Sequence, residues 1–203
     1  MIIIGVDEAG RGPLVGSVIA AAVTFPENFY LEGLTDSKKL TEKKRENFYS
    51  QIIHKCNWSV GEASCIEIDQ INILQATMLA MKRAINNLQL ELSISYKDDQ
   101  FKVLVDGNQC PDVSNCQAIV RGDLIEPVIS AASVIAKVTR DRQMKELDLK
   151  NKLIKKLTSP PKTIGLDRIS IVSIQDDIES WEVLYSYPLI SKKSGNMNLG
   201  RPV

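Results

Sequence analysis

The sequence predicts an α/β or α+β domain, in which short strands form one sheet and helices pack against it. Two observations lead to this prediction. Short runs of β-branched and other apolar residues alternate with longer segments whose apolar residues recur every three or four positions. Most of the short runs end at glycine, proline or acidic residues, as strands commonly do. We expect the first three strands to be antiparallel neighbours and the next two to be brought alongside them by helices.

The first half of the chain predicts three strands and two helices. Strands are expected at 2–6, 16–24 and 58–64, each a short apolar or β-branched run. A helix begins at about Thr41, which is a good N-terminal cap. A second helix spans about 69–90, where apolar residues recur every three or four positions: Ile71, Leu74, Met78, Met81, Ile85 and Leu88.

The second half predicts two strands, each with an acid at its end, and a helix. "FKVLVDGN" (101–108) indicates a strand that ends on Asp106, and "CQAIVRGD" (116–123) another that ends on Asp123. A helix follows over 126–147, with a proline in its first turn, where the missing N–H costs nothing. Beyond the break at 158–163 the pattern is weak, although 169–174 fits a strand.

Composition restricts the class of protein. With 203 residues, 44% of them apolar and 25% charged, the chain suits one globular domain, or one with an appendage. The formal net charge is zero, so a nucleic-acid partner would need a local basic patch. No apolar run approaches the ~20 residues of a transmembrane helix, so no membrane is expected. Four cysteines without a Cys-x-x-Cys pair predict reduced thiols in the cytoplasm.

Four carboxylates recur at the ends of expected strands: Asp7 and Glu8, Asp106, and Asp123. Strand ends at one edge of a sheet can converge, and ionised carboxylates that share a small volume repel one another. A hard divalent cation with oxygen ligands relieves that repulsion, so these residues predict a metal site for phosphodiester hydrolysis. The alternative for any one of them is an ordinary turn or helix cap.

A glycine-rich loop follows the first acidic pair. Gly10, Arg11 and Gly12 lie directly beside Asp7 and Glu8. Glycines let the backbone approach a ligand closely, and their N–H groups can face a sugar or a phosphate. The alternative is a flexible turn without a ligand.

Five stretches together resemble the ribonuclease HII family over residues 2–148. They are "GVDEAGRGPLVGSVIAAAV", "DSKKLTEKKRE", "IDQINILQATMLAM", "VLVDGN" and "RGDLIEPVISAASVIAKVTRDR". The resemblance implies an RNase H-like fold, a five-stranded mixed sheet flanked by helices. It also implies an endonuclease that cuts the RNA strand of RNA–DNA hybrids. Such enzymes also cut 5′ of ribonucleotides embedded in duplex DNA, and leave 3′-hydroxyl and 5′-phosphate ends.

The same resemblance implies the roles of single residues. The family's catalytic metal ligands, for Mn²⁺ or Mg²⁺, fall on Asp7, Glu8, Asp106 and Asp123. Its Gly-Arg-Gly motif, which contacts the ribose 2′-hydroxyl, falls on residues 10–12, and that hydroxyl is what distinguishes RNA from DNA.

Further substrate contacts are expected from basic and hydroxyl residues. Ser37 and Lys38 lie in the segment that resembles the family's backbone-contacting loop. Lys137, on the helix after Asp123, is expected to contact a phosphate, whereas Arg140 is expected to pair with Asp141 or Glu126.

The last quarter of the chain departs from the family pattern. We therefore divide the protein into an RNase H-like catalytic domain at 1–148 and a divergent region at 149–203, which is a candidate substrate-binding region. The family's junction-sensing tyrosine is assigned neither to Tyr185 nor to Tyr187. Three origins of the residues 149–203 stay open. They are a divergent form of the family's substrate-binding helices, the product of a shifted reading frame, or a different appendage. The metal site is predicted to survive, and the preference for a single embedded ribonucleotide to weaken.

Two other functions are compatible with the sequence. One is a hybrid-binding module whose catalysis is impaired by the altered C-terminal region. The other is a different nuclease or a transposase that uses carboxylates and two metals on the same general fold. For the ribonuclease the expected partner is an RNA–DNA hybrid or a ribonucleotide-containing duplex DNA, and the protein is expected to be a monomer.

Overall fold

Five strands form a mixed sheet in the computed structural model, which describes residues 1–92, 101–150, 168–174 and 181–188. The sheet order is β3-β2-β1-β4-β5. The strands β1, β2 and β3 pair antiparallel, whereas β4 pairs parallel with both β1 and β5. The bounds are β1 (Ile2–Ala9), β2 (Val18–Thr24), β3 (Asn57–Ala63), β4 (Phe101–Asp106) and β5 (Cys116–Ile119). The expected five-stranded mixed sheet is confirmed.

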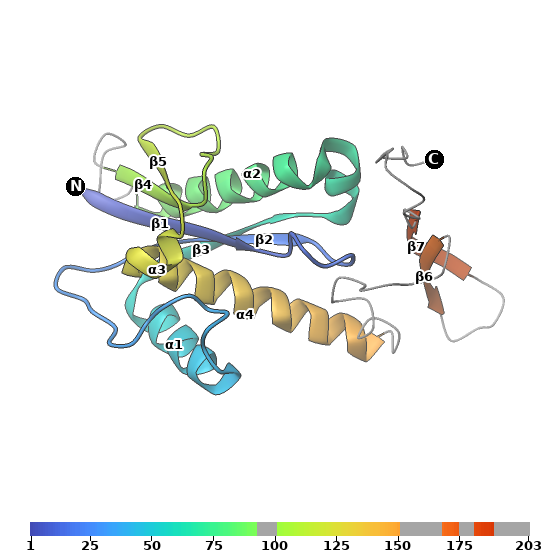
Figure 1. The fold of residues 1–203 in the computed structure, drawn as a ribbon, viewed down its shortest axis with the longest axis horizontal. Coiled ribbons are helices and arrows are strands. Elements are labelled where there is room, and N and C mark those ends of the chain that lie inside the picture. Colours follow the sequence, from blue (N-terminus) through green and yellow to red (C-terminus); the bar gives the residue numbers. More distant parts are fainter. Residues whose placement is uncertain (93–100, 151–167, 175–180, 189–203) are drawn as a thin grey trace, which may run out of the picture. The chain divides into compact units, whose positions relative to one another are not determined.

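Helices cover both faces of this sheet. The helix α2 (Cys65–Leu92) lies on one face, and α1 (Glu42–Lys55) and α4 (Pro127–Lys150) lie on the other (Figure 1). A short helix, α3 (Gly122–Ile125), directly precedes α4. Apolar clusters lie between the sheet and the helices on both faces. Ile4 and Val103 pack with α2, whereas Val23 of β2 packs with α1 and α4. Burial on both sides explains why these strands are continuous apolar runs.

Local side-chain bonds set where the helices begin. The Thr41 hydroxyl accepts a hydrogen bond from the N–H of Lys44 and caps α1, as the sequence predicted. Ser64 and Glu67 bond each other's backbone N–H and form a capping box for α2, four residues before the predicted start. Inside α2, Asn72 adopts φ 67°, and its side chain accepts from two following N–H groups, so the helix restarts there.

A glycine allows the first turn of α4 to approach the sheet. A Cβ added to Gly5 of β1 would collide with the main-chain carbonyl group of Val128. This close approach places the first turns of α4 beside the C-terminal half of β1, where the first acidic pair lies.

Two predicted elements differ in the structure. The strand predicted at 116–123 ends at Ile119, because Arg121 adopts a left-handed conformation (φ 58°) and Gly122 starts α3. The chain also reaches β5 from β4 through 107–115 without a helix, although we expected helices to bring both of these strands to the sheet.

The described residues form two units, 1–11 with 16–143, and 12–15 with 144–203. The second unit contains an antiparallel pair, β6 (Arg168–Ile174) and β7 (Trp181–Pro188). The strand predicted at 169–174 is confirmed, whereas β7 was not predicted. The predicted break at 158–163 lies outside the described residues. No helix in the described parts of the chain is long and apolar enough to cross a membrane.

Candidate metal centre

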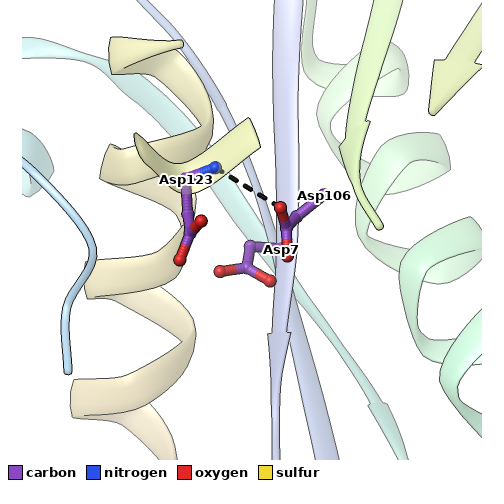
Figure 2. Close-up of side chains that lie close together, drawn as sticks. All are labelled: Asp7, Asp106 and Asp123. Carbon is purple, nitrogen blue, oxygen red and sulfur yellow. Dashed lines mark hydrogen bonds between the residues drawn. The ribbon is translucent and has the colours of Figure 1, made fainter. Parts of the chain in front are cut away.

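Three carboxylates from different segments meet on one face of the sheet. Asp7 lies in β1, Asp106 ends β4, and Asp123 lies in the first turn of α3. One oxygen from each carboxylate lies within 4.8 Å of an oxygen of both others. Figure 2 shows the three side chains pointing toward one another. Asp7 exposes only 6% of its surface, and Asp123 exposes 9%. Asp106 is half-buried, and three carboxylates so close together form a set of oxygen ligands suited to a divalent cation.

Strand periodicity explains which acids meet. Along β1, Ile4 and Val6 face α2, so Gly5 and Asp7 face α4. Along β4, Val103 and Val105 face α2, which turns Asp106 toward Asp7.

The fourth predicted ligand, Glu8, is not among the three carboxylates that meet. Glu8 follows Asp7 directly in the strand, so its side chain leaves the backbone toward the other face of the sheet. Its Oε1 lies 3.3 Å from the guanidinium Nη1 of Arg11. Glu8 nevertheless lies near enough to raise the pKa of Asp7 by repulsion. Its role as a ligand stays a prediction.

Main-chain and hydroxyl groups hold the carboxylates in place. The N–H of Glu8 donates to Asp7 Oδ1 at 2.7 Å, and the N–H of Asp123 donates to Asp106 Oδ1 at 3.4 Å. The Ser130 hydroxyl of α4 donates to the carbonyl oxygen of Asp123 at 2.8 Å. A hydrogen-bonded carboxylate keeps its rotamer, so the cluster is partly organised by the fold itself.

Burial and mutual repulsion raise the pKa values of two of these carboxyl groups. Desolvation, followed by repulsion from Glu8, raises the pKa of Asp7 well above its usual value. Desolvation, followed by repulsion from Asp106 and Asp36, also raises the pKa of Asp123, and the charge of Lys38 opposes that change. Both shifts mean that negative charge is unfavourable here until a cation compensates it.

The loop 36–40 reaches the same site. The pKa effects of Asp36 and Lys38 on Asp123 show that both charges lie close to it, and the N–H of Lys38 donates to Asp36 Oδ1 at 2.8 Å. Lys38 is exposed, whereas Ser37 is buried with its hydroxyl against Ser133 of α4. The Lys38 ammonium therefore lies near the carboxylates and open to solvent.

Arg45 of α1 holds the loop 36–40 through two hydrogen bonds to its main chain. Its Nε donates to the carbonyl oxygen of Ser37, and its Nη2 to that of Leu40, both at 3.0 Å. Its Nη1 lies 3.4 Å from Oδ2 of Asp141 on α4. Lys137 binds the other oxygen of Asp141 at 2.6 Å, so one carboxylate holds both cations.

The first glycine of the Gly-Arg-Gly loop is tightly packed. Gly10 adopts φ +117°, and a Cβ there would lie 2.7 Å from both Arg140 Nε and the carbonyl oxygen of Ser17. Arg140 is buried, and its Nε donates to that carbonyl. Gly12 belongs to the second unit and is not placed relative to the carboxylates.

Sequence reasoning missed several residues that organise the site. Ser130 and Ser133 lie three positions apart on one face of α4, and both are buried. Two serines inside the apolar stretch "VISAASVIA" were a usable signal, because a buried hydroxyl needs a partner. Asp36 and Arg45 carried no such signal, since charged residues in a segment of lysines and glutamates indicate a solvated surface.

Comparison with known proteins decides the family. Residues 4–165 match the family model described as Ribonuclease HII. The chain belongs to the ribonuclease HII family. A ribonuclease HII from Polynucleobacter necessarius subsp. necessarius is 59% identical over 145 residues, which are 70% of this chain and 72% of that protein. One from Acinetobacter baylyi is 58% identical over 151 residues, which are 73% of this chain and 76% of that protein.

A solved structure agrees with the family. The ribonuclease H2 from Pyrococcus horikoshii OT3 superposes with a TM-score of 0.60 and 29% identity, over 74% of this chain and 77% of that one. The recognition of ribonuclease HII from the sequence is confirmed, as are the RNase H-like fold and the assignment as an endoribonuclease.

Proposed function

We propose that this ribonuclease HII is a metal-dependent endonuclease for the RNA strand of RNA–DNA hybrids. It would also cut 5′ of ribonucleotides embedded in duplex DNA, and leave 3′-hydroxyl and 5′-phosphate ends. The observation that carries the metal dependence is the convergence of Asp7, Asp106 and Asp123 within 4.8 Å. The raised pKa values of Asp7 and Asp123 support the proposal, because desolvated carboxylates that repel one another favour a compensating cation.

Asp7, Asp106 and Asp123 would hold Mn²⁺ or Mg²⁺, and Glu8 would complete the set from the neighbouring position of β1. Bound divalent cations activate water and neutralise the charge that develops on the phosphodiester. The protein's part is to keep the oxygens oriented, through the N–H groups of Glu8 and Asp123. Three carboxylates that the fold already brings together lower the cost of organising the site when a cation binds.

Substrate binding would come from groups around the carboxylates. Lys38, exposed and close to Asp123, would contact a phosphate without reading sequence. The N–H groups of Gly10 and Arg11 would face the ribose and its 2′-hydroxyl, and the family resemblance gives Gly12 the same role. Lys137 would contact a second phosphate, although it must then share its charge with Asp141.

A nicking assay tests this function. The wild-type protein is incubated with a labelled RNA–DNA hybrid, with Mn²⁺, with Mg²⁺ and with a chelator, and the ends of the products are mapped. We expect nicking with either metal, none with the chelator, and loss of nicking in Asp106→Asn. Tight hybrid binding without nicking at any metal concentration would instead indicate the hybrid-binding module with impaired catalysis. Nicking that persists in the chelator would contradict the metal site.

A further inference from the structure

We propose that Arg140 is a positioning residue for ribose recognition, because its buried side chain contacts the main chain at both ends of the loop 10–17. The inference rests on the proposed function, since it concerns the N–H groups of Gly10 and Arg11 that would face the 2′-hydroxyl. It assigns a role to a cation inside the protein, where no phosphate can reach it.

The two ends of the loop meet at the Arg140 side chain. The loop 10–17 connects β1 to β2, which pair antiparallel. At its second end, Nε of Arg140 donates to the carbonyl oxygen of Ser17 at 3.4 Å. At its first end, a Cβ on Gly10 would lie 2.7 Å from Nε and 3.1 Å from Cδ of Arg140. The stem of the arginine therefore packs directly against the glycine backbone.

A second side chain of α4 also holds Ser17. The Ser17 hydroxyl donates to Oε1 of Gln143 at 3.2 Å, and the Gln143 amide donates to Oε2 of Glu62 at 3.3 Å. Arg140 and Gln143 lie three positions apart, on one face of the helix. The end of the loop that leads into β2 is thus bonded to α4 twice, once through its main chain and once through its side chain.

Burial indicates what Arg140 contributes. It exposes 4% of its surface, and Ser17 exposes 7%. Desolvation lowers the pKa of Arg140, so enclosing this charge is unfavourable for the protein. A buried cation is a poor source of net stability, but its bonds hold their partners in one geometry. The contribution of Arg140 is therefore to fix the conformation of the loop ends.

The conformation of Gly10 determines where the loop can donate. Gly10 adopts φ +117°, which side chains rarely adopt, and its backbone sets the direction of the next peptide plane, which carries the N–H of Arg11. Without the Arg140 side chain against it, Gly10 can relax and turn that N–H away from the ribose. A hydrogen bond weakens steeply when its angle falls below about 120°, so a modest rotation is enough to lose the contact.

Two ligands that differ only at the 2′ position separate this role from a merely structural one. One is an RNA–DNA hybrid, and the other is the same hybrid with 2′-fluoro nucleotides in place of the ribonucleotides. Fluorine cannot donate a hydrogen bond and accepts one poorly, whereas the hydroxyl does both. The affinity for each is measured at low salt with a chelator present, so that neither is cut. The ratio of the two affinities reports the 2′-hydroxyl contact alone.

The wild type should bind the RNA hybrid about 5- to 10-fold more tightly than the 2′-fluoro hybrid, as expected for one hydrogen bond or slightly more. Arg140→Met, which keeps the apolar stem and removes the guanidinium, should lower this ratio to about 1–2. The Kd for Mn²⁺, measured by calorimetry without nucleic acid, should stay within twofold of the wild type, because the carboxylates are held by other groups.

Three further variants complete the experiment. Arg140→Lys keeps the buried charge but places a methylene where Nε lies, so it should also lower the ratio, and it replaces Arg140→Met if that variant does not fold. Gly10→Ala, whose Cβ would collide with Nε, should lower the ratio as well. Combined with Arg140→Met it should lower the ratio by less than the product of the two single effects, because both changes disturb one contact. Arg142→Ala is the matched control on the same helix, since its ion pair with Glu46 is exposed, and it should leave the ratio unchanged.

The outcomes are distinct. A folded Arg140 or Gly10 variant that keeps the wild-type ratio overturns the inference, as does an equal fall in Arg142→Ala. If the wild type nicks and distinguishes the two hybrids while the Arg140 variants do so equally, this inference alone fails. If the wild type does not distinguish them, the proposed ribose contact fails, and this inference fails with it.

Discussion

Replacing Arg45 with alanine should destabilise the protein and displace the loop 36–40. Arg45 exposes 14% of its side chain and donates at 3.0 Å to the carbonyl oxygens of Ser37 and Leu40, two buried residues. A hydrogen bond from a charged donor contributes about 1.5–3 kcal/mol, and water replaces part of it. Two such bonds give an expected loss of about 2–4 kcal/mol for Arg45→Ala.

Arg45→Lys should lose about half as much stability as Arg45→Ala, because an ammonium lacks the planar fork that reaches both carbonyl groups. Urea unfolding measures both changes. The same variants are assayed on an RNA–DNA hybrid, where a displaced Lys38 should lower kcat/KM about 10- to 100-fold.

Arg142→Ala is the matched control. Arg142 also joins α4 to α1, through an ion pair of 2.7 Å with Glu46, but that pair is 50% and 42% exposed. Its guanidinium also lies 4.2 Å from the ring centroid of Tyr49. Exposed pairs of this kind contribute about 0–1 kcal/mol. If Arg45→Ala lowers the free energy of unfolding no more than Arg142→Ala does, or leaves kcat/KM unchanged, then Arg45 does not hold the loop 36–40 as described.

Three other predictions test separate parts of the account. Asp7→Asn should stabilise the metal-free protein at pH 7. The raised pKa of Asp7 means that the native state keeps this proton to higher pH than the unfolded chain, so wild-type stability falls as pH rises from about 4. Urea unfolding across pH should show a smaller fall in the variant, and an equal fall would contradict the assignment. Gly5→Ala should cost more than about 3 kcal/mol in thermal or urea unfolding, since its Cβ would meet the main chain of Val128. Gly12→Ala, whose Cβ meets no described atom within 4 Å, should change stability by less than about 0.5 kcal/mol, and similar losses at the two sites would refute the packing argument. Finally, the divergent region at 149–203 predicts that the preference for a lone ribonucleotide in duplex DNA over a continuous hybrid is weak, and a strong preference in parallel rate measurements would contradict it.

The sheet could be predicted because burial on both faces leaves continuous apolar runs in the sequence. The first strand was nevertheless predicted to end at Val6, whereas β1 continues to Ala9. Acidic residues are depleted in strands, but Asp7 and Glu8 pair with Ala21 and Ala20 of β2, and this pairing outweighs their propensity. The conformation of Arg121, which ends β5 early, has no local signal, because glycine or asparagine is the usual residue at positive φ.

The candidate site was predictable as a set of acids but not as an arrangement. Adjacent residues of a strand start toward opposite faces, so the sequence alone could have separated Glu8 from Asp7. The link between Ser37 and Ser133 was beyond sequence reasoning, since it joins residues 96 positions apart through two hydroxyls that fit many other partners.

The central claim is that Asp7, Asp106 and Asp123 together bind a divalent cation. A crystal grown with Mn²⁺, with anomalous diffraction data collected at a wavelength where manganese scatters, tests it most directly. The account predicts an anomalous peak at coordination distance from an oxygen of each of these three residues. The peak should be absent in crystals of Asp106→Asn. Manganese located elsewhere on the protein, with the three carboxylates bound only to protein groups, would contradict it.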